Sequence, residues 1–172
     1  IQQQPQSKPL DETRSLIENG GFAYDRSKAA GERAVMEAVN NGLHALVLSP
    51  TAIIGPADPE PSLIGNAVMD IYNRKIPSLV PGGYDWVDVR DIVPAAISAI
   101  ERGRRGEKYL LSGNWHSLQE FSDLIRLHSG RKTVNTVLPM WIARCGLPFI
   151  PLLSKISGTK PLYTSESLTI IS

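Results

Sequence analysis

The amino-acid sequence predicts an α/β fold, in which helices alternate with short apolar strands. Two observations carry this prediction. A helical pattern over Tyr24–Asn40 leads into Leu43–Ser49, an almost wholly apolar run of the kind formed by strands that are buried on both faces. Helical and strand-like segments then alternate along the rest of the chain, as they do in proteins with parallel sheets. The chain has 172 residues, which is enough to bury one core.

The first elements follow from the residue pattern. Residues 1–23 are rich in Gln, Pro and Gly, which predicts a loop. The helix after this loop is expected to end at Gly42, and the strand after the helix at Pro50. The apolar stripe of the helix consists mainly of small side chains, namely Ala30, Ala34, Val35, Ala38 and Val39. Such a stripe predicts either a homodimer face or packing on the chain's own sheet, and the pattern alone does not choose between them.

Further elements are predicted in this order: helix Ser62–Arg74, strand Tyr84–Val89, helix Asp91–Arg102, strand Glu107–Leu111, a helix ending at His128, strand Thr133–Leu138, and an interrupted amphipathic helix within Met140–Ile156. The helix that ends at His128 begins at a capping box, in which the side chains of Ser117 and Glu120 each bond the other's backbone N–H. Gly130 is placed to close this helix, and Pro139 suits the first turn of the next one.

The composition excludes several classes of protein. The net charge is +1, and Lys and Arg are spread along the chain, so nothing favours a nucleic-acid partner. A single cysteine, Cys145, excludes an internal disulfide and a thiolate zinc cluster, and the three histidines lack metal-ligand spacing. No run approaches the roughly 18 to 20 apolar residues of a membrane span, and the first residues do not resemble a signal peptide. We therefore expect a cytoplasmic protein without a metal or a membrane anchor.

Tyr24 and Lys28 form the most informative pair in the chain. Residues four apart share one face of a helix and lie about 6 Å apart along its axis, so the ammonium comes close to the phenol. A free tyrosine ionises only near pH 10, and a neighbouring cation stabilises the phenolate, which would allow proton transfer at neutral pH. The pattern is short, and as an isolated match it indicates an ordinary solvated helix face more than a catalytic pair.

The segment Ser49–Pro56 gives this pair a context. It begins where the predicted buried strand ends and runs into a loop rich in Pro and Gly. In open α/β sheets, ligands bind beyond the carboxyl ends of the strands. Pro50 fixes the chain there, and we expect the backbone of Thr51 to Ile53 to be available to a planar ligand. The alternative is an ordinary turn at the end of a strand.

Three segments together resemble a known family. Tyr24–Glu32, Leu48–Pro56 and Trp86–Val93 are similar, in order and spacing, to the extended short-chain dehydrogenase/reductases, the superfamily of the NAD-dependent epimerases and dehydratases. Within it, 82–91 and 108–113 most resemble the dihydroflavonol-reductase-like branch.

This resemblance implies the C-terminal part of a Rossmann-type, doubly wound parallel sheet with a small α/β substrate-binding subdomain. Residues 1–58 would be the catalytic part and 59–172 mostly the substrate-binding part, with 84–102 returning to the core sheet.

The resemblance also implies roles for individual residues. Tyr24 would exchange a proton with a substrate carbonyl or alcohol, while Lys28 would hold the nicotinamide ribose and activate Tyr24. The edge of the nicotinamide would be lined by Pro50, Thr51, Ala52 and Ile53. The cofactor would be NAD or NADP, with NADP favoured slightly. Asp91 matches an acidic family position at a helix start, where we expect it to cap the helix.

One departure from the family bears on the substrate. Nucleotide-sugar enzymes of this superfamily usually carry an arginine two residues before the position of Trp86, and Tyr84 stands there instead. A tyrosine cannot neutralise a diphosphate as an arginine does. We therefore expect a small aldehyde, ketone or flavonol-like substrate. A nucleotide-sugar epimerase or dehydratase, and a noncatalytic member that binds a cofactor, remain the alternatives.

A second departure concerns the cofactor phosphates. The chain contains no G-x-x-G-x-x-G or G-x-G-x-x-G sequence, so the family's glycine-rich phosphate loop has no counterpart here. The chain is therefore interpreted as a C-terminal fragment of a longer enzyme, with poor cofactor binding and negligible turnover expected of these 172 residues alone.

Overall fold

The computed structural model describes residues 9–18 and 20–146, and they form two compact units. The first unit consists of the described residues up to Thr51 together with Val89–Ser112. The second consists of Ala52–Asp88 and the described residues from Gly113 onward. The predicted division into a catalytic part, 1–58, and a mostly substrate-binding part, 59–172, with 84–102 returning to the core sheet, stays a prediction.

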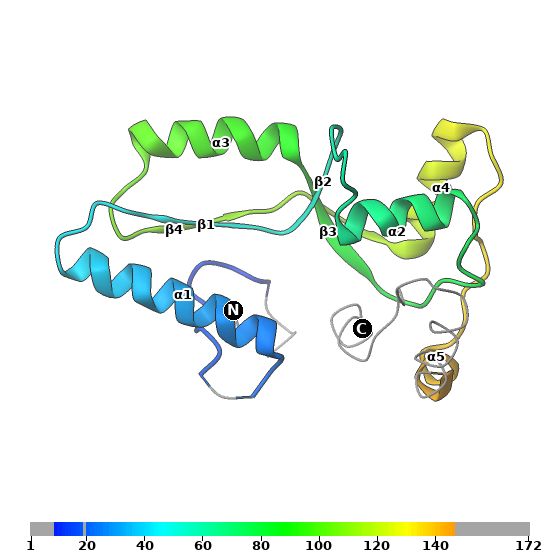
Figure 1. Cartoon of the computed structure of the whole chain (residues 1–172), viewed down its shortest axis with the longest axis horizontal. Helices are drawn as coiled ribbons and strands as arrows, with labels where there is room; N and C mark the ends of the chain where they lie inside the picture. The colour runs from blue at the N-terminus through cyan, green and yellow to red at the C-terminus, as the bar shows by residue number, and fades with distance from the viewer. Residues whose placement is uncertain (1–8, 19, 147–172) are drawn as a thin grey trace. The chain divides into compact units, whose positions relative to one another are not determined.

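The first unit is an α/β layer around two parallel strands. Helix α1 (Ala23–Asn40) leads into β1 (Val47–Pro50), and α3 (Val89–Arg102) leads into β4 (Lys108–Leu111). The strands pair in parallel with Val47 opposite Lys108 and Pro50 opposite Leu111. The two helices lie on opposite sides of the strand pair (Figure 1). This arrangement confirms the predicted α/β class with parallel strands.

Two polar contacts join β4 to helix α1 and to the loop that precedes α1. An ion pair joins Lys108 Nζ and Glu32 Oε1 at 2.6 Å, between side chains that are only 18% and 12% exposed. The two atoms are close enough for an ion pair. Their geometry is not that of a hydrogen bond, and Glu32 Oε1 accepts no hydrogen bond from the other described residues. On the same strand, the backbone N–H of Leu110 donates to Glu12 Oε1 at 2.8 Å. The loop before α1 thereby covers part of the outer edge of β4.

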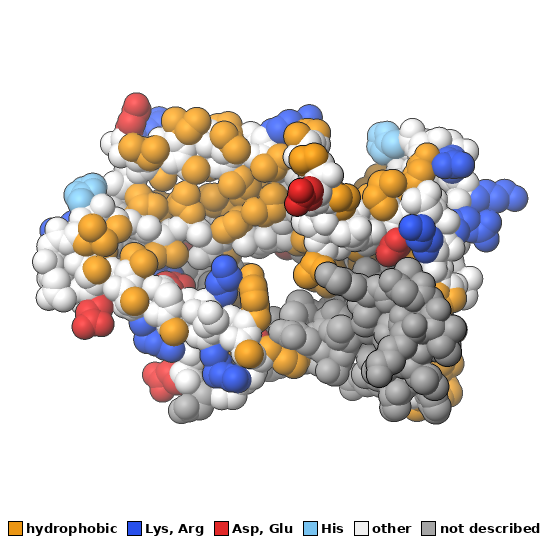
Figure 2. Space-filling model, in the orientation of Figure 1, with side chains coloured by type: hydrophobic (Ala, Val, Ile, Leu, Met, Phe, Trp, Pro, Cys, Tyr) orange, Lys and Arg blue, Asp and Glu red, His pale blue; other side chains and the backbone are white. Residues whose placement is uncertain are grey.

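Helix α3 keeps apolar side chains in contact with solvent. None of its residues is fully buried, and Val93, Ile97 and Ile100 are exposed, Ile100 by 82%. Their spacing places them on one face of the helix. Figure 2 shows apolar side chains along this helix.

The second unit contains a three-stranded mixed sheet and three helices. Its elements are β2 (Ala52–Ile54), α2 (Leu63–Tyr72), β3 (Gly83–Asp88), β5 (Asn114–Ser117), α4 (Leu118–Ser129) and α5 (Met140–Gly146). The strand order is β2-β3-β5, with β2 parallel and β5 antiparallel to β3. One part of the core is formed by Ile71, Ile76, Leu79 and Val134. Among the described residues, no helix is long and apolar enough to cross a membrane.

Several predicted elements were wrong in type or extent. Strands β2 and β5 were not predicted, because each is short and is defined by its pairing with β3. Thr133–Leu138 is not a strand, since it makes only one isolated bridge, between Val137 and Leu79. The strand predicted over Leu43–Ser49 begins only at Val47. Of the amphipathic helix within Met140–Ile156, the structure describes α5, and residues 147–156 lie outside the described part.

Two finer predictions also need correction. Strand β1 includes Pro50 instead of ending before it. The N–H groups of Val47 and Thr51 point to β4, so the N–H that Pro50 lacks falls on the other edge of the strand, where a proline is tolerated. In the predicted stripe of α1, Ala30 and Ala34 are exposed. The buried residues of this helix are Ala29 and Val39.

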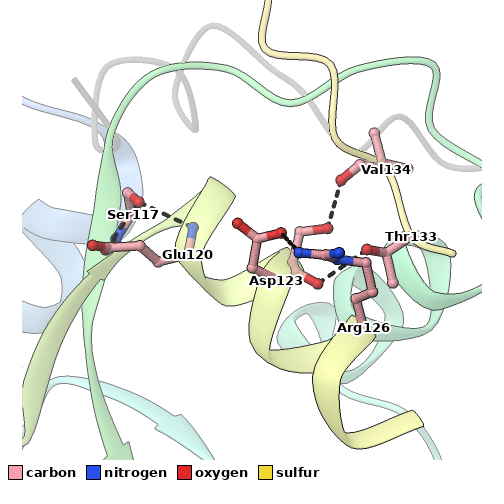
Figure 3. Close-up of polar contacts among 7 residues, drawn as sticks. Ser117, Glu120, Asp123, Arg126, Thr133 and Val134 are labelled. Carbon is pink, nitrogen blue, oxygen red and sulfur yellow. Dashed lines mark hydrogen bonds and ion pairs between the residues drawn. The ribbon is translucent and has the colours of Figure 1, made fainter. Parts of the chain in front are cut away.

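A buried hydroxyl ties α4 to the segment after it. Ser122 is fully buried and donates to the carbonyl of Val134 at 2.5 Å, while the hydroxyl of Thr133 donates to the carbonyl of Ser122 at 3.0 Å (Figure 3). The bond from Ser122 satisfies the carbonyl of Val134, which lies outside the helices and strands, and the bond from Thr133 adds a second contact to α4.

The Ser122→Ala variant is expected to lose about 1–3 kcal/mol of unfolding free energy, because the carbonyl of Val134 loses its buried donor. Urea unfolding followed by circular dichroism measures the loss. Ser27→Ala, on the exposed side of α1, is the matched control and should change stability by about 0.5 kcal/mol or less. Equal stability of the two variants would show that the buried bond contributes nothing.

The capping box predicted at the start of α4 is confirmed. The carboxylate of Glu120 accepts from the N–H of Ser117 at 2.8 Å, and Ser117 Oγ accepts from the N–H of Glu120 at 3.1 Å (Figure 3). The N–H of Ser117, followed by its hydroxyl, lowers the pKa of the Glu120 carboxyl.

A depressed pKa in the folded state gives a pH dependence of known sign. The ionised Glu120 stabilises the fold above its unfolded pKa, and this contribution is lost as the pH falls through the folded pKa. Glu120→Gln should therefore lose stability less steeply than the wild type between neutral and acid pH, as measured by urea midpoints. Glu37→Gln, at an exposed glutamate of α1, is the matched control. The capping box has no such role if the stabilities of the two variants fall in parallel as the pH is lowered.

Candidate active site

The start of α1 is fixed by two side chains of its own first turn. Asp25 Oδ2 accepts from the backbone N–H of Phe22 at 3.3 Å. Arg26 Nη1 donates to the carbonyl of Gly21 at 2.7 Å, and Gly20 and Gly21 both adopt positive φ angles. Glycine adopts this backbone conformation without strain, so the chain can turn tightly into the helix.

The structure brings Tyr24 and Lys28 together on the first two turns of α1. Lys28 Nζ lies 5.5 Å from the centroid of the Tyr24 ring, within cation–π range. Both side chains are exposed, Tyr24 by 63%. Neither makes a hydrogen bond or ion pair with another described residue, so the phenol and the ammonium are available to a ligand. The ammonium lies over the face of the ring, a more specific arrangement than shared helix spacing alone predicts.

The strand end after this helix is held by β4. The N–H of Thr51 donates to the carbonyl of Leu111 at 3.1 Å, and the Thr51 hydroxyl lies 3.4 Å from the same oxygen. Pro50 is exposed at the last position of β1. Leu111 was missed from the sequence, because positions 51 and 111 are joined only by the strand register.

The expectation that the backbone of Thr51 to Ile53 is available to a ligand is wrong for the Thr51 N–H, which is bonded to Leu111. Ala52 and Ile53 do not form a loop either, since they belong to β2 and pair with Trp86 and Val87 of β3. Tyr24, Lys28, Pro50 and Thr51 belong to the first unit, whereas Ala52 and Ile53 belong to the second. The predicted ligand-binding role of Pro50, Thr51, Ala52 and Ile53 stays a prediction.

Aromatic side chains line the centre of the second unit. Trp86 stacks on Phe121 with ring centroids 4.4 Å apart, and Tyr84 meets Trp86 edge to face at 5.3 Å. Burial raises the pKa of the Tyr84 hydroxyl. The indole Nε1 of Trp86 is buried without a hydrogen-bond partner among the described residues. Tyr84 is thus a neutral, half-buried group at the position where the resemblance led us to look for an arginine.

Asp91 lies inside the first turn of α3, where its charge complements the helix N-terminus. It does not occupy the cap position, because the helix already begins at Val89. No group of three or more His, Cys, Asp or Glu among the residues that the structure describes could hold a metal ion.

Comparison with known proteins decides the family. The model of the NAD dependent epimerase/dehydratase family matches residues 2–112. The chain belongs to this family. The structure agrees, since the epimerase/dehydratase family includes solved proteins with the same α/β arrangement. One is a nucleoside-diphosphate-sugar epimerase from Pseudomonas aeruginosa, with a TM-score of 0.74 and 26% identity over 95% of this chain and 54% of that one.

Two curated relatives of this chain have different names. Sterol demethylase protein B of Methylococcus capsulatus is 32% identical over 119 residues, covering 69% of this chain and 36% of that protein. A Synechocystis protein named, provisionally, as dihydroflavonol 4-reductase is 28% identical over 133 residues, covering 75% of this chain and 39% of that protein. The chain therefore spans well under half the length of either relative.

The described residues fit one end of the family's dinucleotide cofactor. The exposed Lys28 ammonium and Tyr24 hydroxyl are donors suited to ribose hydroxyls. No glycine-rich loop opens a helix among the described residues, so the cofactor phosphates have no comparable seat in this part of the chain. The chemistry of these two donors fits a ribose, and their role in binding one stays a prediction.

Proposed function

We propose that this chain carries the proton-transfer part of an NAD(P)-dependent oxidoreductase that reduces the carbonyl of a small molecule, or oxidises the corresponding alcohol. The observation that carries the proposal is the contact between Lys28 and the exposed ring of Tyr24 on α1. Membership in the NAD-dependent epimerase/dehydratase family supports it, because that family works with a nicotinamide cofactor.

Each residue would act through its own chemistry. The Tyr24 hydroxyl would donate a proton to the carbonyl oxygen of the substrate as that oxygen gains negative charge. Lys28 would hold the ribose hydroxyls of the cofactor and favour the phenolate that Tyr24 becomes. Pro50, Thr51, Ala52 and Ile53 would line the nicotinamide edge. The cofactor supplies the hydride when it is bound. It would be NAD or NADP, with NADP slightly favoured.

The proposed substrate is a small aldehyde, ketone or flavonol-like compound. Tyr84 supports this choice, because a half-buried neutral phenol cannot neutralise a diphosphate. The name of the Synechocystis relative is consistent with it.

A nucleotide-sugar epimerase or dehydratase is the second candidate, and the P. aeruginosa structure favours it because that protein bears the name of a nucleoside-diphosphate-sugar epimerase. The third candidate is a noncatalytic family member that binds a cofactor. The exposed pair of Tyr24 and Lys28 argues against this candidate, because a noncatalytic protein does not need a proton donor.

The three candidate functions differ in whether NADPH is consumed during the reaction. The protein encoded by the complete reading frame is incubated with NADPH and two panels, one of small carbonyl compounds and one of nucleotide sugars. The proposal expects net oxidation of NADPH with a carbonyl compound. Conversion of a nucleotide sugar without net oxidation would establish the second candidate, and binding of NADPH without turnover on either panel would establish the third.

A further inference from the structure

A basic hollow lies in the second unit, where α2 and α4 end. Its volume is about 320 Å³, and it is lined by Tyr72, Asn73, Arg74, Arg131 and Lys132. Three of these five side chains are cationic and none is acidic. Lys and Arg side chains gather over the ends of the two helices (Figure 2). A hollow of this volume is at the small end of the range for small-molecule sites.

Arg131 is held in place before any ligand arrives. Its Nη1 donates to the hydroxyl of Tyr72 at 3.0 Å, and its Cζ lies 5.0 Å from the centroid of the Tyr72 ring. A guanidinium has five N–H donors, so this bond leaves others for a ligand. Because the side chain is already oriented, binding costs less conformational entropy than it would with a mobile arginine.

Arg74 occupies a backbone position that favours glycine. It directly follows the C-cap residue Asn73 and has a φ of 56°, in the left-handed region. Helices commonly place glycine there, because other side chains cost free energy in this conformation. An arginine at this position keeps a positive charge beside the hollow at the expense of backbone strain.

Among the described residues, no acidic side chain forms an ion pair with the cations that line the hollow. Asp70, on the last turns of α2, is 3.9 Å from Lys75, which does not line the hollow. Arg74 and Lys132 make no ion pair with any residue in 9–18 or 20–146. The C-terminal ends of α2 and α4 offset about one unit of positive charge, which leaves about two.

We propose that this hollow binds the diphosphate group of a small molecule. Arginine forks match the geometry of phosphate oxygens, and two arginines with one lysine can engage two adjacent phosphates. The proposal concerns residues other than Tyr24 and Lys28 and does not depend on the function proposed for that pair.

Inorganic pyrophosphate is the probe, titrated into the 172-residue chain at low ionic strength by calorimetry. We expect saturable binding at one site, about tenfold tighter than that of inorganic phosphate, because only the diphosphate engages all three cations. Arg131→Gln should weaken pyrophosphate binding by about tenfold. Absence of saturable binding, or equal affinity for phosphate and pyrophosphate, would overturn the proposal.

Two further variants separate the hollow from general charge and from misfolding. Arg104→Gln removes an exposed positive charge in the first unit and should leave affinity within about twofold of the wild type. An equal loss in Arg104→Gln and Arg131→Gln would mean nonspecific attraction and would reject the site. Arg74→Gly relieves the backbone, so it should melt at the same or a higher temperature while binding pyrophosphate more weakly.

A last arm tests the source of the phosphate. The chain is mixed with vesicles that contain anionic phospholipid and, separately, with pyrophosphate. Saturable binding of pyrophosphate, without sedimentation of the chain on the vesicles, supports a small-molecule ligand. Sedimentation on vesicles that both pyrophosphate and Arg131→Gln abolish would assign the hollow to a membrane surface and overturn the proposal.

Discussion

In the complete protein, Tyr24→Phe is expected to lower kcat for carbonyl reduction by about 10²- to 10⁴-fold, the usual contribution of a positioned general acid. The ring and its contact with Lys28 remain, so the change removes the hydroxyl and little else. Tyr24 is largely exposed, and we therefore expect the urea midpoint to stay unchanged. Steady-state oxidation of NADPH with the best carbonyl substrate measures the loss.

Tyr109→Phe is the matched control for this experiment. It removes a phenolic hydroxyl from β4 in the same unit, where that oxygen accepts from the backbone N–H of Arg104 at 3.0 Å. Stability should fall by about 1 kcal/mol, with kcat preserved. If Tyr24→Phe keeps wild-type kcat, Tyr24 is not the proton donor. If both variants lose activity alike, the loss reflects folding.

Gly113→Ala is expected to cost about 3 kcal/mol or more of unfolding free energy, the largest stability effect we anticipate. A Cβ at this position would lie 1.9 Å from the carbonyl oxygen of Trp86 and 2.9 Å from the Cα of Val87. These are backbone atoms of β3 and cannot move away as a side chain would. The N–H of Gly113 also donates to Asp85 Oδ1 at 2.8 Å, so displacing the chain breaks that bond as well.

Gly31→Ala provides the comparison, because the same added methyl group on α1 meets nothing within 4 Å. Alanine has the higher helix propensity, so this variant should gain about 0.5–1 kcal/mol. Urea unfolding of both variants gives the difference directly. A Gly113→Ala protein as stable as the wild type would mean that β3 and the chain at Gly113 approach less closely than the structure shows.

Local patterns predicted the helices well because their ends are encoded nearby. Ser117 and Glu120 form the predicted capping box, and Gly130 closes α4 in the left-handed conformation with a φ of 68°. The pairing of Tyr24 with Lys28 was predictable for the same reason, since helix geometry alone places them on one face.

The strands were harder because their partners are distant in sequence. Asn114–Ser117 has no alternating pattern, and it is a strand only because Gly83–Trp86 lies beside it. Thr133–Leu138 looked like a strand by composition. Its Val134 carbonyl is taken by the hydroxyl of Ser122, which leaves a single bridge at Val137. The basic hollow could not be predicted either, because Arg74 and Arg131 are far apart in the sequence and line the same hollow only in the folded chain.

The two edges of the β1–β4 pair differ in a way that bears on handling the protein. Among the described residues, no second strand pairs with β1, whereas Glu12 covers the Leu110 N–H on the far edge of β4. That N–H is also the main cause of the lowered pKa of the Glu12 carboxyl. Acidification through the lowered pKa therefore weakens this cover and leaves the Leu110 N–H unpaired, in addition to the open edge of β1. Storage near neutral pH keeps the Glu12 carboxylate ionised, whereas an acid elution step should favour pairing of these edges with another chain.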